Sequence, residues 1–371
     1  MNSFNKIIAL VIKEFLAILR DPKSRFVLIG PPIIQMIVFG YAATYDLKNV
    51  RYAVYNEDPS VASRELIAGF RGSKNFSESA IITHKEQIES LINEKKVLLV
   101  IHIDSQFNRD LILGKSAQVQ VIIDGRNSNT AMIALNYVRS IVTNFNMQWA
   151  KTHAIKNSIP TIKTRAWFNP NLESRWFIVP GIIALLTLVV TMMVTALSVA
   201  REREQGTFDQ LLVTPFTPFQ ILLGKAIPGF VVGFFEATLV IMITVFWFKI
   251  PLRGHLVTLY IGLSLYLLSS VGVGLMISSL VVTMQQGLLG AFLFLVPSII
   301  LSGFTTPIEN MPIWIQYLTR VNPMRYFLVI IRTTFLEAAS FNNLIHQFWP
   351  MLLIGFTCLT FAGWLFRHRM Y

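Results

Sequence analysis

Long apolar stretches alternate with charged segments along the 371-residue chain. Six of these stretches can cross a bilayer as helices, because about 20 mostly apolar residues span the hydrocarbon and a helix satisfies its own backbone hydrogen bonds there. They cover residues 26–45, 176–198, 221–248, 256–282, 284–304 and 348–366. The pattern therefore predicts an all-α polytopic membrane domain of six transmembrane helices.

Residues 46–175, between the first two stretches, carry most of the chain's charges and no long apolar run. Short runs rich in Val, Ile and Tyr predict strands, and the segments between them have helical spacing. The expected strands are 50–55, 79–83, 97–103 and 119–123, and the expected helices are 62–70, 85–95, 107–113 and 129–156. This alternation predicts an inserted α/β or α+β domain that contains parallel strand pairs.

Residues 1–25 contain an amphipathic helix that precedes the first stretch. Its apolar residues recur at helical spacing, while Lys6, Lys13 and Arg20 fall on the opposite face. Such a helix suits the membrane interface, with its basic edge toward lipid headgroups or toward a cytoplasmic partner. The pattern favours neither over the other.

Residues 199–220 connect the second and third stretches. Thr207 begins a capping-box pattern, which predicts a short helix that must end before Pro215. Thr217 begins a second such pattern, and Pro218 suits the first position of the helix that follows. We therefore expect a compact helix that lies under the membrane between two defined ends. A helix in this position can transmit a displacement to the membrane helices.

Lys and Arg near the apolar stretches indicate the orientation, since they are enriched on the cytoplasmic side. With the N-terminus inside, the inner set is larger than the outer set. The inner set is Lys6, Lys13, Arg20, Lys23, Arg25, Arg201, Arg203, Lys225, Arg367 and Arg369, and the outer set is Lys249, Arg253, Arg320, Arg325 and Arg332. Both termini are then cytoplasmic, residues 46–175 are extracytoplasmic, 305–347 form outer short helices and 367–371 a cytoplasmic tail. The first apolar stretch is longer than the apolar region of a normal secretory signal, so we interpret it as a retained anchor.

The composition agrees with a membrane protein: 53% of residues are hydrophobic, 14% are charged and the mean hydropathy is +0.55. A net charge of +12 is also typical of nucleic-acid binding, but basic flanks of membrane helices explain it without a polynucleotide partner. The single cysteine, Cys358, excludes an internal disulfide and any cysteine-rich metal site. No metal site is expected.

The sequence contains no G-x-x-x-x-G-K-[ST] phosphate loop, H-E-x-x-H or G-x-S-x-G motif. A catalytic role is therefore not expected, and a chain that exports by ATP hydrolysis must recruit its hydrolase. ATP and Mg²⁺ would bind that partner, and no cofactor would bind this chain.

Glu236 is the most conspicuous acidic residue inside an apolar stretch. Ionisable groups at membrane depth are expensive to bury and are functional candidates by default, although contacts between helices also bury polar groups. A structural hydrogen bond and a substrate or proton site both remain open. The candidate transport path consists of Met192, Met193, Glu236, Pro297 and Phe304.

A resemblance to a known family is carried by the segment Arg201–Pro215, Arg-Glu-Arg-Glu-Gln-Gly-Thr-Phe-Asp-Gln-Leu-Leu-Val-Thr-Pro. It resembles the coupling segment of bacterial ABC transporter permeases of the type-2 exporter class, with Asp209 where Glu is commoner. Leu301–Pro307, Met311–Trp314 and Asn322–Tyr326 resemble the outer segment that precedes the last span in that class. The resemblance covers the whole chain and is closest to the drug-efflux-like branch of Gram-negative inner membranes.

The resemblance implies an exporter half that pairs with a second permease, identical or paralogous, and with cytoplasmic ABC ATPase subunits. The residues implied for ATPase coupling are Arg201, Glu202, Arg203, Glu204, Gly206, Thr207, Asp209, Gln210 and Leu211, and those implied for the interface helix are Lys6, Lys13, Glu14 and Arg20. The second and fifth spans would meet their counterparts and line the route of a hydrophobic or amphipathic substrate. A periplasmic adaptor or outer-membrane channel is a further partner, for which the turn from Asp124 to Thr130 is a candidate contact.

Two other classes of function remain as alternatives. An ion-coupled secondary transporter would use Glu236, but its usual signature, an inverted repeat, is not found in the sequence. A membrane sensor would use the inserted domain, but the inner segments are too short for an output domain.

Overall fold

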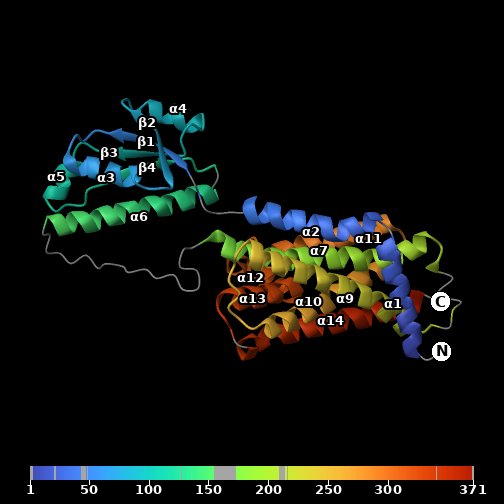
Figure 1. The fold of residues 1–371 in the computed structure, drawn as a ribbon. Helices are drawn as coiled ribbons and strands as arrows, with labels where there is room; N and C mark the ends of the chain where they lie inside the picture. Colours follow the sequence, from blue (N-terminus) through green and yellow to red (C-terminus); the bar gives the residue numbers. More distant parts are fainter. Residues whose placement is uncertain are drawn as a thin grey trace. The chain divides into compact units, whose positions relative to one another are not determined.

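The computed structural model describes residues 3–20, 22–42, 47, 49–126, 128–153, 173–208, 214, 216–339 and 341–369. The chain divides into two compact units (Figure 1). Met1–Ala43 together with Ala166–Tyr371 form the first, which we call the helical unit, and Thr44–Arg165 form the second, which we call the sheet unit.

The helical unit is built almost entirely from long helices packed side by side (Figure 1). An N-terminal helix, α1, precedes them, and short helices lie between α11 and α14. In chain order they are α1 (Ser3–Arg20), α2 (Pro22–Ala42), α7 (Ser174–Glu204), α9 (Pro218–Met242) with a π-helical continuation (Ile243–Trp247), α10 (Leu256–Leu280), α11 (Met284–Ile300), α12 (Ile313–Leu318), α13 (Pro323–Leu336) and α14 (Phe341–Arg369).

Four helices in the described part of the chain are long and apolar enough to cross a membrane. They are Ser174–Glu204, Pro218–Trp247, Leu256–Leu280 and Phe341–His368. The fifth predicted stretch corresponds to α11, which has only 17 residues, and the first corresponds to α2. The chain is thus a mostly helical protein with several membrane-crossing helices, and the count of six stays a prediction.

Several helix limits differ from the predicted ones for identifiable reasons. The last helix was expected from residue 348 but begins at Phe341, because its first two turns carry polar residues that an apolar pattern does not detect. The helix expected over 284–304 ends at Ile300, and Gly303 beyond it has a φ of +85°, in the left-handed region that turns the chain. Residues 305–347 contain short helices, as predicted.

The predicted start of α9 is confirmed. The Thr217 hydroxyl accepts a hydrogen bond from the backbone N–H of Gln220, the Gln220 side chain accepts one from the N–H of Thr217, and Pro218 occupies the first turn. The short helix expected between Thr207 and Pro215 depends on residues 209–213 and 215, which lie outside the described residues.

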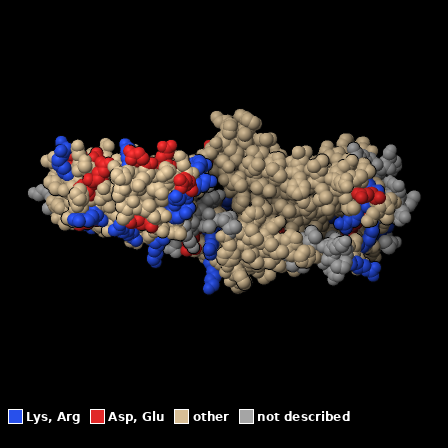
Figure 2. Space-filling view, turned by 90° about the horizontal axis from the view of Figure 1, so that it is seen from above, with Lys and Arg blue, Asp and Glu red and all other residues tan. Residues whose placement is uncertain are grey.

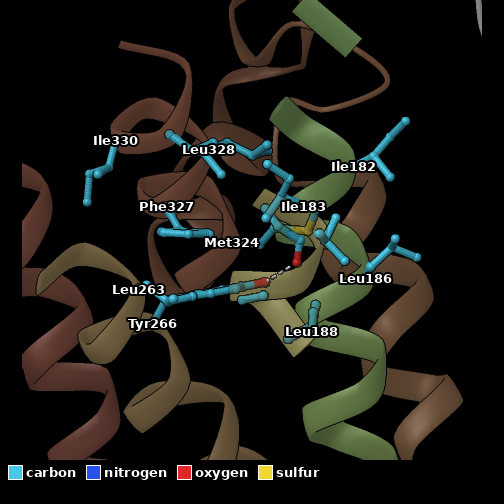
Figure 3. Packing of buried hydrophobic residues seen from close by; sticks show 14 of the residues in the cluster. Ile182, Ile183, Leu186, Leu188, Leu263, Tyr266, Met324, Phe327, Leu328 and Ile330 are labelled. Atoms are coloured by element: carbon cyan, nitrogen blue, oxygen red, sulfur yellow. Dashed lines mark hydrogen bonds between the residues drawn. The ribbon is translucent and has the colours of Figure 1, made fainter. Parts of the chain in front are cut away.

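The core of the helical unit centres on α7, which is the most buried of the four candidate membrane helices. Tyr266 of α10 stacks on Phe327 of α13, with ring centroids 4.5 Å apart, and its hydroxyl donates to the carbonyl of Ala184 in α7 at 2.9 Å (Figure 3). A Cβ added at Gly274 would lie 1.8 Å from the Thr195 hydroxyl, so glycine is required where α10 meets α7. Small residues allow this close approach in membrane helices.

The sheet unit contains a four-stranded sheet in the order β2-β1-β3-β4. Its elements are β1 (Val50–Asn56), α3 (Val61–Arg71), β2 (Phe76–Ile82), α4 (Gln87–Asn93), β3 (Leu99–Ile103), α5 (Phe107–Ile112), β4 (Val119–Ile123) and α6 (Ser128–Thr152). β1 pairs with β2 and with β3 in parallel, as predicted, and β3 pairs with β4 antiparallel. Apolar side chains fill both faces of the sheet, with α3, α5 and α6 on one and α4 on the other.

Candidate functional site

The amphipathic helix α1 packs against α9 rather than standing free. Leu10 is its most buried apolar residue, and a Cβ added at Gly224 of α9 would lie 2.7 Å from the Leu10 side chain. This close contact brings the middle of α1 to the first turns of α9. Lys13 and Glu14, one turn further along α1, therefore come close to α7 and α9, where the side chain of Glu14 is 15% exposed and that of Lys13 is 49% exposed.

A buried network of four charged residues joins α1, α7 and α9 at this point. Lys225 Nζ lies 2.7 Å from Glu202 Oε2 and 3.1 Å from Glu14 Oε1, and Lys13 Nζ lies 2.6 Å from Glu202 Oε1. The side chains of Lys225 and Glu202 are only 3% and 8% exposed, whereas that of Lys13 is 49% exposed. Two positive and two negative charges offset one another, which makes burial of this network tolerable.

The last turn of α7 also holds α10 and α11. Arg203 donates from Nη1 to the carbonyls of Ser279 and Val281 at 3.1 and 2.9 Å, at the C-terminal end of α10. Glu204 Oε2 accepts from the backbone N–H of Met284 at 2.6 Å, in the first turn of α11. Both contacts place a charge where the helix dipole favours it. One turn of α7 is therefore bonded to four other helices.

The residues implied for coupling occupy different environments. Glu202 is buried and committed to two lysines, Arg201 is half-buried, and Glu204 is exposed. Gly206 is exposed with a φ of +68°, and Thr207 bonds to the Glu202 carbonyl through its N–H and hydroxyl. Asp209, Gln210 and Leu211 lie outside the described residues.

These environments change what is expected of Glu202. Because its carboxylate is buried beside two lysines, reversing the charge of Glu202 is expected to disturb the fold as well as any coupling. On α1, Lys6 is half-buried and Arg20 is exposed. Lys225 is the residue of this network whose role sequence reasoning missed. The available signal was a lysine one turn inside an apolar stretch, where an unpaired cation would be costly.

Among the described residues of the helical unit, Glu236 is the other buried acid, at 4% exposure in α9. Within the described residues neither of its carboxyl oxygens has a hydrogen-bond partner, and neither do the hydroxyls of Thr187 and Thr191 on α7. The Thr187 hydroxyl is the polar group beside the carboxyl, without reaching hydrogen-bond geometry. Unsatisfied buried oxygens cost free energy, which favours a role other than stabilisation.

The other residues of the candidate transport path are not in one environment. Met192 is fully buried in the core around α7, and Met193 is half-buried. Phe304 packs closely on Gly181, while Pro297 is exposed on α11. Their shared role in transport stays a prediction.

The turn that begins at Asp124 is held by hydrogen bonds between Asp124 and Arg126. Asp124 Oδ1 accepts from the backbone N–H of Arg126 at 3.0 Å, and the Arg126 guanidinium lies 2.7 Å from Asp124 Oδ2. These hydrogen bonds lower the pKa of Asp124 to about 2. Arg126 also donates to the carbonyl of Ile92 at 2.7 Å, so this turn is anchored to α4.

Among the described residues, no group of three or more His, Cys, Asp or Glu side chains is arranged to hold a metal ion. The charged chemistry of the helical unit is instead that of ion pairs between helices. The visible face of the helical unit in Figure 2 is mostly uncharged, with Lys, Arg, Asp and Glu gathered at the end that carries α1.

Comparison with known proteins gives one consistent result. Residues 23–364 match the family described as ABC-2 family transporter protein. The chain is 41% identical over 367 residues, 99% of this chain and 100% of the relative, to the probable multidrug ABC transporter permease YbhR of Escherichia coli K12. It is 34% identical to the probable multidrug ABC transporter permease YbhS of the same strain, over 90% of this chain and 89% of that protein. It is 22% identical to the linearmycin resistance permease protein LnrN of Bacillus subtilis, over 97% and 98%.

Proposed function

Because the chain belongs to the ABC-2 transporter family and is a permease subunit, we propose that it exports hydrophobic or amphipathic compounds, drug-like or lipid-like, from the cytoplasm or the inner leaflet. The multidrug designation of its relatives YbhR and YbhS supports this substrate class. The uncharged surface of the helical unit suits such compounds, which partition into a bilayer. As an ABC permease, the chain works with ATPase subunits that hydrolyse the ATP.

We propose that the protein lies in the bacterial inner membrane with six spans and both termini in the cytoplasm. The excess of Lys and Arg near the inner ends of the spans supports this orientation. In this arrangement the ion-pair network and α1 face the cytoplasm, and the sheet unit is periplasmic. α2 and α11 supply the two spans beyond the four long apolar helices.

The observation that carries the proposal is the end of α7. Its last turn is bonded to α1 through Lys13, to α9 through Lys225, to α10 through Arg203 and to α11 through Glu204. A displacement applied there would reach four helices at once, because ion pairs and hydrogen bonds connect them without an intervening loop. We assign contact with the ATPase to the exposed Glu204 and Gly206, and the positioning of the helices to the buried Glu202.

We further propose that two permeases assemble, as a homodimer or with a paralogue. The exposed apolar side chains of α11, among them Leu289, Phe292 and Leu293, offer a surface for a second copy. The periplasmic sheet unit would then be available to an adaptor or an outer-membrane channel, with the turn at Asp124 as a contact. ATP and Mg²⁺ would bind only the ATPase.

The test is co-purification of the tagged permease with an ABC ATPase subunit, followed by ATPase assays of the complex. Glu204→Gln keeps an oxygen that can accept from the Met284 N–H, so it should leave the permease folded and reduce the stimulation of ATPase activity by transport substrates. Glu65→Gln, on an exposed position of the sheet unit, is the matched control and should change nothing. A permease that never associates with an ATPase and exports on its own would refute the proposal and favour an ion-coupled transporter.

A further inference from the structure

A large apolar groove opens on the side of the helical unit formed by α9, α10 and α14. Its volume is about 820 Å³, within the range of roughly 300–1,000 Å³ typical of sites for small molecules. Leu222 and Phe230 of α9, Leu268 of α10, and Phe356 and Trp364 of α14 contribute to its wall. A groove of this size and composition fits a long hydrocarbon chain.

One end of the groove has positive character. Among the described residues that line it, Arg367, near the C-terminal end of α14, is the only charged one. Thr217 and Pro218 line the same groove and form the N-terminal end of α9. The capping box already satisfies the N–H groups of Thr217 and Gln220, so the helix dipole contributes only a general preference for an anion here. The group that can bind a phosphate directly is the Arg367 guanidinium. The groove thus combines an apolar body with an anion-binding end.

Aromatic side chains indicate that this end lies near a membrane surface. Trp364 is 51% exposed. Its ring stacks on Phe361, with centroids 5.6 Å apart, and lies tilted against His368, with centroids 4.3 Å apart. Trp residues are enriched where hydrocarbon meets headgroups, because the ring is apolar and its N–H is polar. A headgroup at Arg367 would lie one helical turn from Trp364.

We propose that this groove binds one anionic phospholipid of the surrounding bilayer. Its phosphate lies at Arg367 and the N-terminal end of α9, and an acyl chain lies along Leu222, Leu268 and Phe356. The site depends on the helical unit lying in a membrane but not on export. A second permease is a weaker occupant, because no residue that lines the groove belongs to α7 or α11, the helices expected at the dimer contact.

The test is a lipid titration of the delipidated full-length permease, in detergent, followed by native mass spectrometry. Phosphatidylglycerol and phosphatidylcholine with identical acyl chains are the two probes. We expect one phosphatidylglycerol to bind about tenfold more tightly than phosphatidylcholine, the size expected of one charge-assisted contact. Arg367→Gln should abolish this preference, because it weakens phosphatidylglycerol more than phosphatidylcholine, whose choline cation already offsets the charge of its phosphate. Because Arg367 is exposed, this variant should fold normally.

Ala226→Trp, which fills the groove, should weaken binding of both lipids, and Arg64→Gln in the sheet unit should change neither. Equal binding of the two lipids by the unaltered protein would overturn the proposal. A preference for phosphatidylglycerol that survives Arg367→Gln would also overturn it. So would a permease dimer that dissociates in the Ala226→Trp variant but not when lipid is added, because a second permease would then occupy the groove. The titration uses no ATP or ATPase, so its failure is distinguishable from failure of the export proposal.

Discussion

α9 carries two buried charged residues, Lys225 and Glu236, whose surroundings are opposite. Lys225 lies near the first turns and pairs with two carboxylates, Glu14 and Glu202. Glu236 lies three turns further along, and neither of its oxygens has a hydrogen-bond partner among the described residues. Both are about 4% exposed, so burial alone does not separate them.

The difference between the two residues indicates different roles. A buried charge whose partners are complete holds helices in place, and removing one partner leaves the others uncompensated. A buried acid without partners costs free energy in the observed conformation, so its presence needs a reason other than stability. The Lys225 network thus joins three helices through ion pairs, whereas a role of Glu236 in transport stays a prediction.

Lys225→Met should produce the largest effect. The substitution keeps the length of the side chain but leaves Glu14 and Glu202 without their shared partner, which should destabilise the helical unit by about 3–5 kcal/mol. Thermal unfolding in detergent measures the loss, and protease sensitivity of α1 reports whether this helix detaches. Stability equal to that of the unaltered protein would contradict the role of the network.

A compensated variant provides the control for Lys225→Met. Glu14→Gln and Glu202→Gln added to Lys225→Met remove all the charges that Lys225 balances. Because paired charges replaced together are often nearly neutral in stability, the triple variant should recover most of the loss.

Glu236→Leu, in the same helix as Lys225, should raise the stability of the protein instead of lowering it. Replacing the unpartnered carboxyl by an apolar side chain removes a desolvation cost, so stability should rise by about 1–2 kcal/mol. Export should fall at the same time, and Glu236→Gln should show the same loss of export. A large drop in melting temperature with export intact would assign Glu236 a structural role instead.

Tyr266→Phe sharpens the comparison with a neutral buried group that does have a partner. The variant loses the hydrogen bond to the Ala184 carbonyl but keeps the stacking on Phe327. We expect a loss of about 1 kcal/mol, the usual net value of one hydrogen bond. Thermal unfolding of Tyr266→Phe and Lys225→Met side by side would show whether the buried ion pairs contribute more to stability than one ordinary hydrogen bond.

Arg71→Gln tests an exposed ion pair and should have the smallest effect. Arg71 lies 2.7 Å from Glu78 and lowers the pKa of that carboxyl below its usual 4.5. A carboxyl whose pKa is lower in the folded state stabilises above its unfolded pKa, and this contribution disappears as the pH falls through the folded pKa. Because the Arg71 side chain is 57% exposed, the loss at pH 7 should be only about 0.5 kcal/mol. Hydrogen exchange of β2, corrected for intrinsic rates, should show the two proteins converging as the pH falls below 4.

The fold of the sheet unit could be predicted closely, since its strands are short apolar runs between clear turns. β2 is the exception, because it was expected from residue 79 and begins at Phe76. Its first residues include Ser77 and Glu78, which do not look like a strand, but Phe76 packs edge-on against Tyr52 and pairs with Val50. Contacts between distant residues fix that end, and a local pattern does not contain them.

The candidate site was only partly predictable. The positions of Glu202, Lys13 and Glu14 were identified, but their mutual contacts depend on how α1 packs against α9. Leu10 facing Gly224 decides that packing, and nothing in the spacing along either helix specifies it. The sequence therefore pointed to these residues without showing that Glu202 faces inward.

The most direct test of the account is the membrane side on which the end of α7 lies. Cys358→Ser removes the single cysteine of the chain. In that background, two separate variants each carry one thiol at an exposed position: Glu204→Cys in the helical unit and Ser79→Cys in the sheet unit. A membrane-impermeant maleimide should label Ser79→Cys in intact spheroplasts and label Glu204→Cys only after permeabilisation. Labelling of Glu204→Cys from outside would place the network away from any cytoplasmic ATPase and contradict the account.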